Sequence, residues 1–124
     1  MPARVMIADD SLFMRTLLRR VLAPLDVEVI GEADNGDDAI TGYADLKPDL
    51  LLLDITMPGT SGITAAKRIL AEYPDACIIV CSALASSERA MATLKLGVRD
   101  LITKPFEAAD IQQRIRHVLN GQIA

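Results

Sequence analysis

The chain alternates short apolar runs with segments of helical periodicity, and this alternation restricts its possible folds more than any other feature. Five apolar runs recur along it, at Val5–Ala8, Val27–Ile30, Leu50–Leu53, Ile78–Cys81 and Leu101–Ile102. The third and fourth runs are the most continuous, which is typical of central strands that helices cover on both faces. Strands that alternate with helices favour parallel pairing through right-handed crossovers. The pattern therefore predicts an α/β fold, a doubly wound five-stranded parallel sheet with helices on both faces.

Helical periodicity marks most of the segments that follow these runs. Apolar residues at helical spacing form four faces: Leu12, Leu17, Leu18, Val21 and Leu22; Ile63, Ala66, Ile69 and Leu70; Met91, Leu94 and Leu96; and Ile111, Ile115, Val118 and Leu119. We expect these faces to pack on the sheet. A weaker helix, interrupted by Gly42, is predicted over residues 34–44. Three prolines, Pro24, Pro48 and Pro74, end helices where the alternation requires turns.

Length and composition indicate one soluble domain. The 124 residues are 51% hydrophobic and 24% charged, a balance that allows a buried core, so we expect a single domain over residues 1–124. The net charge is −4 and the 13 Lys and Arg residues form no basic run, which argues against binding to nucleic acid. No apolar stretch approaches the ~18 residues needed to cross a bilayer, and residues 1–4 run straight into a short apolar segment without the h-region of a signal peptide. We expect a cytoplasmic protein without membrane insertion.

The two cysteines and the single histidine do not form a recognisable site. Cys77 and Cys81 lie four residues apart in one apolar run, and on a strand that spacing is about 13 Å, too far for a disulfide. Together with the distant His117 they do not match a zinc site. We predict two buried thiols and a solvated histidine.

Polar residues that can bind a ligand or take part in catalysis follow four of the five runs. Asp9 and Asp10 follow the first, Asp54 the third, Ser82 the fourth and Lys104 the fifth. Because the carboxyl ends of parallel strands meet at one edge of a sheet, we expect these side chains to share a crevice. Each residue alone could instead be a helix cap or an ordinary loop residue.

The joint arrangement has a chemical consequence that the single residues lack. Three clustered carboxylates repel one another unless a cation joins them, and all-oxygen ligands at this charge suit Mg²⁺. With the metal bound, one carboxylate can act as a nucleophile toward a phosphoryl group, while Lys104 supplies a second positive charge and Ser82 a hydrogen bond. The residues therefore predict phosphoryl transfer to a carboxylate, aided by Mg²⁺.

Four short motifs contain these residues. They are Asp9-Asp10-Ser11 with Met14 and Arg15 beyond it, residues 54–62 (DITMPGTSG), Ser82-Ala83, and Lys104-Pro105-Phe106. In this order they resemble the acidic pair, the D-x-x-M-P-x-x-x-G signature, the Thr/Ser-Ala pair and the K-P-F motif of response-regulator receiver domains of two-component signalling, especially the stand-alone CheY-like members. The resemblance covers nearly the whole chain.

The resemblance implies a strand order of 2-1-3-4-5 and a role for each site residue. Asp54 would be the phosphorylated residue. Asp9, Asp10 and Asp54 would bind Mg²⁺ together with the backbone carbonyl of Thr56. Ser82 and Lys104 would contact the phosphoryl group, and the Lys104–Pro105 peptide would be cis. The protein would then be a phosphoacceptor that catalyses its own phosphorylation and dephosphorylation, not an enzyme.

The resemblance also implies partners. A sensor histidine kinase or a histidine phosphotransfer protein would supply the phosphoryl group, and a downstream protein would bind the face formed by the fourth helix, the fifth strand and the fifth helix. The chain itself would be a monomer or a weak dimer. Chemotaxis or motility is the process that the resemblance suggests.

One position departs from the family. The implied switch moves the hydroxyl after strand four toward the phosphoryl group, and an aromatic residue on strand five swings into the vacated space. Leu101 occupies the aromatic position here. We expect the switch to rest mainly on Ser82 and on a loop over residues 83–87 that begins at Ala83, with Leu101 a minor participant. Alternatively, Leu101 is an ordinary strand residue packed against the last helix.

Other interpretations fit the sequence less well. A haloacid-dehalogenase phosphatase also uses an Asp nucleophile, Mg²⁺, a Ser or Thr and a Lys, but its nucleophile comes first and an acid follows two residues later. Here Asp54 follows the acidic pair, and position 56 is Thr. A flavodoxin-like FMN protein needs a Ser/Thr-rich phosphate loop after the first strand, where Asp9 and Asp10 would repel phosphate. A receiver module cut from a larger regulator stays open as an alternative.

Overall fold

Five strands pair in parallel and form one sheet in the order β2-β1-β3-β4-β5, within a computed structural model that describes residues 2–83 and 87–120. The strands are β1 (Ala3–Ala8), β2 (Val27–Ala33), β3 (Leu50–Leu53), β4 (Ile78–Ser82) and β5 (Asp100–Thr103). The helices between and after them are α1 (Leu12–Leu22), α2 (Gly36–Leu46), α3 (Gly62–Glu72), α4 (Glu88–Leu96) and α5 (Ala108–Val118). The predicted fold class and the strand order that the resemblance implies are both confirmed.

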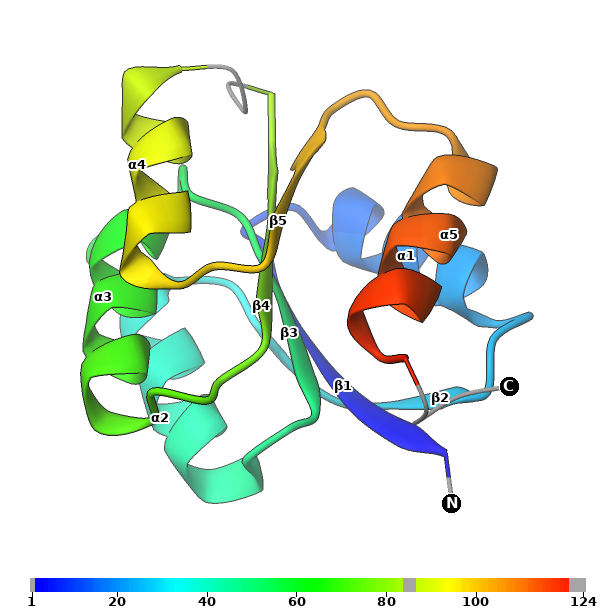
Figure 1. Ribbon diagram of the computed structural model, residues 1–124, viewed down its shortest axis with the longest axis horizontal. Helices are drawn as coiled ribbons and strands as arrows, with labels where there is room; N and C mark the ends of the chain where they lie inside the picture. Colours follow the sequence, from blue (N-terminus) through cyan, green and yellow to red (C-terminus); the bar gives the residue numbers. More distant parts are fainter. Residues whose placement is uncertain (1, 84–86, 121–124) are drawn as a thin grey trace.

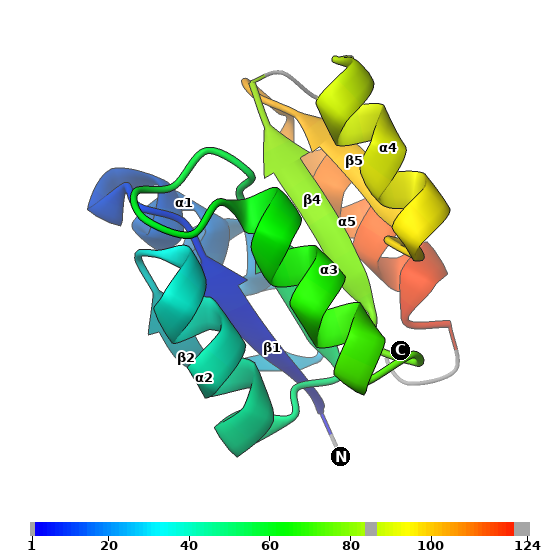
Figure 2. The same cartoon turned by 90° about the vertical axis from the view of Figure 1, so that its left-hand side faces the viewer.

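The helices form a layer on each face of the sheet. Helices α2, α3 and α4 cover one face, and α1 and α5 cover the other (Figures 1 and 2). In β3, Leu51 and Leu53 belong to the core beneath α2, α3 and α4, whereas Leu50 and Leu52 belong to the core beneath α1 and α5. A strand between two layers must be apolar on both sides, which explains the unbroken leucine run. Each leucine that is fully buried in this way contributes about 1.5–3 kcal/mol.

Side-chain caps fix where four of the helices begin. In each of these helices, α1 to α4, the side chain of the cap residue accepts a hydrogen bond from a backbone N–H group in the first turn. The pairs of cap and donor are Ser11 and Met14, Asn35 and Asp38, Ser61 and Thr64, and Ser87 and Ala90. A cap of this kind stabilises a helix by about 1 kcal/mol. Helix α5 begins after Glu107 without such a bond. Each of these four cap residues lies in the loop that joins the carboxyl end of a strand to the next helix.

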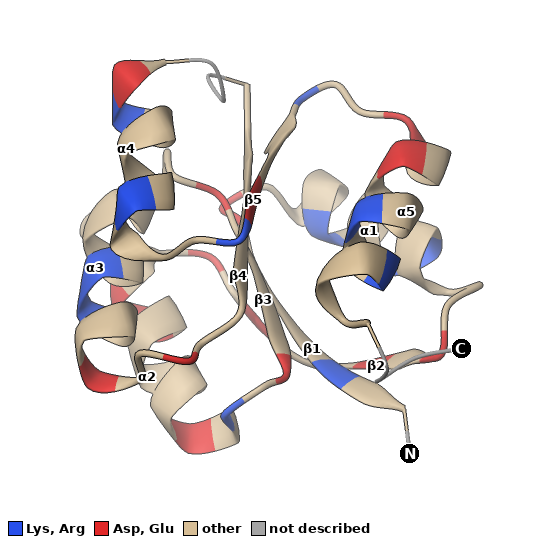
Figure 3. Cartoon of the chain, viewed as in Figure 1, with Lys and Arg blue, Asp and Glu red and all other residues tan. Residues whose placement is uncertain are grey.

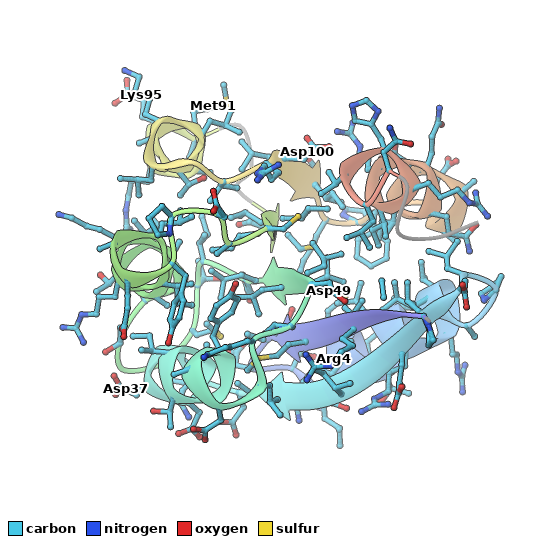
Figure 4. The ribbon with its side chains drawn as sticks, turned by 60° about the horizontal axis from the view of Figure 1, so that its bottom comes forward. Arg4, Asp37, Asp49, Met91, Lys95 and Asp100 are labelled. Carbon is cyan, nitrogen blue, oxygen red and sulfur yellow. The ribbon has the colours of Figure 1, made fainter. Side chains whose placement is uncertain are left out.

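Helix α4 corrects one of the predicted core faces. Met91, Leu94 and Leu96 were predicted to pack on the sheet, but they are 49%, 40% and 38% exposed. The helix instead buries the small residues Ala90 and Thr93, which let its backbone approach the neighbouring elements. Met91 points away from the sheet, as Figure 4 shows.

Helix α1 holds a second misplaced apolar residue. Leu12 was predicted to lie on the buried face of this helix, yet it is 68% exposed, and its neighbour Phe13 is 75% exposed. The core contacts of α1 come from its second half, where Leu18, Val21 and Leu22 are buried. The first turn of α1 therefore adds no buried apolar side chain to the core.

The cysteine and histidine predictions hold in part. Neither Cys77 nor Cys81 is in a disulfide. Cys81 is buried, and burial raises the pKa of its thiol to about 12. Cys77 is only half-buried, and His117 is exposed. Within residues 2–83 and 87–120, no helix has the length and apolar character needed to cross a membrane.

Candidate functional site

Three carboxylates meet at the carboxyl ends of β1 and β3. Asp9 and Asp10 follow β1 and Asp54 follows β3, and one carboxylate oxygen from each lies within 4.8 Å of the others. Asp9 and Asp54 are only 1% and 3% exposed, whereas Asp10 faces solvent. The three side chains that the sequence places at strand ends are therefore brought together. Their oxygens are the ligands that a hard divalent cation such as Mg²⁺ prefers.

Lys104 lies against the two buried carboxylates. Its Nζ donates a hydrogen bond to Asp9 Oδ2 at 2.7 Å and lies 3.5 Å from Asp54 Oδ2. Burial alone would lower the pKa of Lys104, but the hydrogen bond to Asp9 and the charges of both carboxylates raise it above its usual value. The ammonium group therefore stays charged, and it offsets part of the repulsion between Asp9 and Asp54. The peptide bond between Lys104 and Pro105 is cis.

Thr56 holds one oxygen of Asp54. Its backbone N–H and its hydroxyl both donate to Asp54 Oδ1, each at 3.1 Å. The other oxygen, Oδ2, faces Lys104. Burial raises the pKa of Asp54, and the charge of Asp9 adds to the rise, while the Thr56 bonds and the charge of Lys104 oppose it. The hydroxyl contact was not expected, since only the backbone carbonyl of Thr56 was assigned a role from the sequence.

Asp9 is fixed from several directions. Its backbone N–H donates to the carbonyl of Ala33 on β2, and its Oδ1 accepts from the backbone N–H of Ser11. Its backbone carbonyl accepts from Arg15 Nη1 at 2.6 Å. In the sequence, Arg15 was noted only as part of a motif, and no pattern in the chain predicts its hydrogen bond to the Asp9 carbonyl.

The loop that follows Asp54 is held by close backbone packing. A Cβ atom on Gly62 would lie 2.0 Å from the carbonyl oxygen of Asp54, so only glycine fits at the start of α3. On the other side, a Cβ on Gly36 would lie 1.9 Å from the carbonyl oxygen of Thr60. The Thr60 hydroxyl also donates to Asp37 Oδ1 at 2.7 Å. The first turns of α2 and α3 therefore pack closely against the loop that follows Asp54 and fix the backbone of this residue.

Ser82 and Leu101 lie further along the same edge. Ser82 ends β4 and is fully buried, and its carbonyl accepts from the backbone N–H of Lys104. Ala83 is exposed, and residues 84–86 of the loop expected to move lie outside the described residues. Leu101 is half-buried and packs on the core beneath α2, α3 and α4. That core is on the opposite face of the sheet from α5, so the alternative in which Leu101 packs against the last helix is wrong.

Basic residues do not gather into one stripe. Figure 3 shows Lys and Arg on α1, α3, α4 and α5, on both faces of the molecule. Arg114 on α5 is occupied by ion pairs with Asp100 and Asp110.

Comparisons with known proteins point to one family. The family model described as "Response regulator receiver domain" matches residues 5–116. The chain is 42% identical to the chemotaxis protein CheY of Thermotoga maritima over 118 residues, which are 95% of this chain and 98% of that protein. It is 39% identical to the chemotaxis protein CheY of Bacillus subtilis over 120 residues, which are 97% of this chain and all of that protein.

Solved structures give the same result. A crystal structure of the CheX-CheY-BeF3-Mg+2 complex from Borrelia burgdorferi matches with a TM-score of 0.91 and 31% identity, over 96% of this chain and 90% of that one. The response regulator domain of Thermotoga maritima CheB matches with a TM-score of 0.88 and 33% identity, over 97% of this chain and 98% of that one. The chain therefore belongs to the response regulator receiver domain family, whose members are phosphoaccepting signalling proteins and not enzymes in the ordinary sense.

Proposed function

We propose that Asp54 accepts a phosphoryl group from a phosphohistidine on a sensor histidine kinase or a histidine phosphotransfer protein, and that this reaction requires Mg²⁺. The observation that carries the proposal is that the buried carboxylate of Asp54 lies beside both Lys104 and the acidic pair Asp9 and Asp10. Burial raises the pKa of Asp54, which increases its basicity as a nucleophile. The family assignment supports the same role.

The proposed reaction is an in-line displacement at phosphorus. Because Thr56 donates two hydrogen bonds to Asp54 Oδ1, the other oxygen, Oδ2, attacks the phosphorus atom, forming an O–P bond and a mixed anhydride. The N–P bond of the phosphohistidine breaks, and the imidazole leaves with the electron pair and takes up a proton. Lys104 stands beside Oδ2 and pairs with the added negative charge.

The metal would be held by Asp9, Asp10 and Asp54 with the backbone carbonyl of Thr56. Their all-oxygen donor set fits Mg²⁺, and the ion, when bound, supplies positive charge to the developing phosphoryl oxygens. Asp9 keeps one carboxylate oxygen on Lys104 and the other on the backbone of Ser11, so its orientation is set before any ion binds. The same residues would support loss of the phosphoryl group to water, so that the protein catalyses both steps on itself.

Phosphorylation would be read by a downstream protein at the face formed by α4, β5 and α5. Ser82 would move toward the phosphoryl group with Ala83 and the loop that follows, and Leu101 would adjust to a smaller degree. Ser82 ends the strand next to β3, which supports this role.

The chemotaxis proteins among the relatives support chemotaxis as the process. We also propose that residues 1–124 act as one domain, as a monomer or a weak dimer, in the cytoplasm.

The phosphatase alternative lacks support from the site. A haloacid-dehalogenase reaction needs an acid two residues after the nucleophile, and that position is Thr56, whose hydroxyl is engaged with Asp54. The family model that matches the chain is that of the response regulator receiver domain.

The test is phosphorylation by acetyl phosphate, followed by intact-mass spectrometry. Wild type with Mg²⁺ should gain the mass of one phosphoryl group, and wild type in EDTA should not. Asp54→Asn should gain nothing, whereas Asp49→Asn should react as the wild type does. Asp49 is a suitable control because it is a partly buried aspartate at the opposite end of the strands (Figure 4). An adduct on Asp54→Asn, or equal labelling in EDTA, would overturn the proposal.

A further inference from the structure

We propose that Arg15 is a positioning residue for the Mg²⁺ site, because it fixes the peptide unit that joins Asp9 to Asp10. The inference rests on the proposed function, since it assumes that these carboxylates bind the metal. It adds a residue outside the set of metal and phosphoryl ligands described above.

The guanidinium group of Arg15 bridges the acidic turn and the edge strand. Its Nη1 donates to the Asp9 carbonyl at 2.6 Å, and its Nε donates to Glu32 Oε1 on β2 at 2.7 Å. The Arg15 side chain is only 15% exposed. Arg19, one turn later on α1, donates to the other oxygen of Glu32, so this carboxylate is held by two arginines. Arg15 is therefore anchored by an ion pair while it holds the turn.

The bond to the Asp9 carbonyl controls the placement of Asp10. This carbonyl belongs to the peptide unit between the two residues, and a planar peptide fixes the direction in which the chain leaves toward Asp10. The Asp9 side chain has its own partners in Ser11 and Lys104, so it does not depend on Arg15. The Asp10 carboxylate is exposed, so its position relative to Asp54 depends on the backbone that carries it. Outer residues that orient metal ligands typically change metal affinity by ~10–100-fold when they are removed.

Charge alone predicts the opposite effect. Arg15 is a cation near a site for a cation, so removing it should strengthen Mg²⁺ binding if only Coulomb repulsion mattered. Positioning predicts weaker binding. The sign of the change in Mg²⁺ affinity therefore separates the two roles.

The experiment measures the Mg²⁺ dissociation constant of the whole chain by isothermal titration calorimetry. The variants are Arg15→Gln, which removes the charge and the bridge, and Arg15→Lys, which keeps the charge but has no planar group to bridge two partners. Arg19→Gln is the matched control, because it removes the same charge and an ion pair to the same glutamate without a bond to the acidic turn. Melting of each variant in EDTA reports folding separately.

We expect the dissociation constant to rise by about 10-fold in Arg15→Gln. In Arg15→Lys it should rise by a smaller factor, and in Arg19→Gln it should stay within about twofold of the wild type or fall. Unchanged or tighter binding in both Arg15 variants would overturn the inference while leaving the proposed function intact, and so would equal weakening in Arg19→Gln. If the wild type does not bind Mg²⁺, the proposed metal site and this inference both fail.

Discussion

Replacing Lys104 by methionine should destabilise the metal-free protein strongly, because the lysine compensates two buried carboxylates. Its Nζ lies 2.7 Å from Asp9 Oδ2 and 3.5 Å from Asp54 Oδ2. At an effective dielectric constant of about 20, these distances correspond to attractions of about 6 and about 5 kcal/mol. The desolvation of the partly buried lysine offsets much of this gain. Breaking a buried pair by removing one partner costs about 3–5 kcal/mol in practice, and we expect a loss in that range.

The assay is urea unfolding of wild type and Lys104→Met in EDTA and at saturating Mg²⁺. In EDTA the variant should lose about 3–5 kcal/mol, or about 10–20 °C in melting temperature. Mg²⁺ should stabilise the variant more than the wild type, because the ion then replaces the positive charge that Lys104 places beside Asp9 and Asp54. The difference between the two proteins in EDTA should shrink as the pH falls from neutrality, because burial raises the pKa of Asp54 and its protonation removes one of the uncompensated charges.

Lys95→Met is the matched control for this substitution. Lys95 lies on α4, is exposed and points away from the sheet (Figure 4), so its loss should change the free energy of unfolding by no more than about 1 kcal/mol. If Lys104→Met in EDTA is as stable as the wild type, the two carboxylates are not buried and charged together, and our description of the site is wrong.

Three further predictions follow from the same contacts. Asp10→Asn should raise the melting temperature in EDTA and reduce the increase that Mg²⁺ produces, because it removes one of three repelling carboxylates; an unchanged response to Mg²⁺ would argue against a ligand role for Asp10. Burial alone would raise the pKa of Glu32, but its arginine partners lower it, so this carboxylate should contribute stability that is lost as the pH falls below the ordinary value of 4.5. Acid unfolding of Glu32→Gln should accordingly be less steep than that of the wild type below that pH, and equal steepness would contradict the assignment. With beryllofluoride and Mg²⁺, the gain in affinity for a downstream partner should be lost in Ser82→Ala and largely kept in Leu101→Ala; the reverse result would show that the switch rests on Leu101.

The sheet and the acidic cluster could be predicted from the sequence because both depend on residues that follow apolar runs. A continuous run such as Leu50–Leu53, in alternation with helical segments, is typical of a strand covered on both faces, and its end fixes the position of the next polar residue. Parallel strands then bring Asp9, Asp54 and Lys104 to one edge, whatever lies between them in the sequence. The chemistry of the site follows from this topology.

The details that the sequence did not predict depend on packing between elements. Apolar spacing alone could not show that α4 contacts its neighbours through Ala90 and Thr93 and leaves Met91 exposed. The Arg15 bond to the Asp9 carbonyl and the Thr56 hydroxyl bond to Asp54 were missed for a similar reason. They depend on the directions of individual side chains, which no residue pattern encodes.

The most direct test of the account is to locate the phosphoryl group on the chain. After reaction with acetyl phosphate and Mg²⁺, reduction with borohydride converts a phosphorylated aspartate to homoserine, which peptide mass spectrometry assigns to a position. The account predicts homoserine at position 54 and at no other aspartate, in a yield that falls to background in EDTA. Homoserine at Asp9 or Asp10, or an unmodified position 54 in a phosphorylated chain, would contradict it.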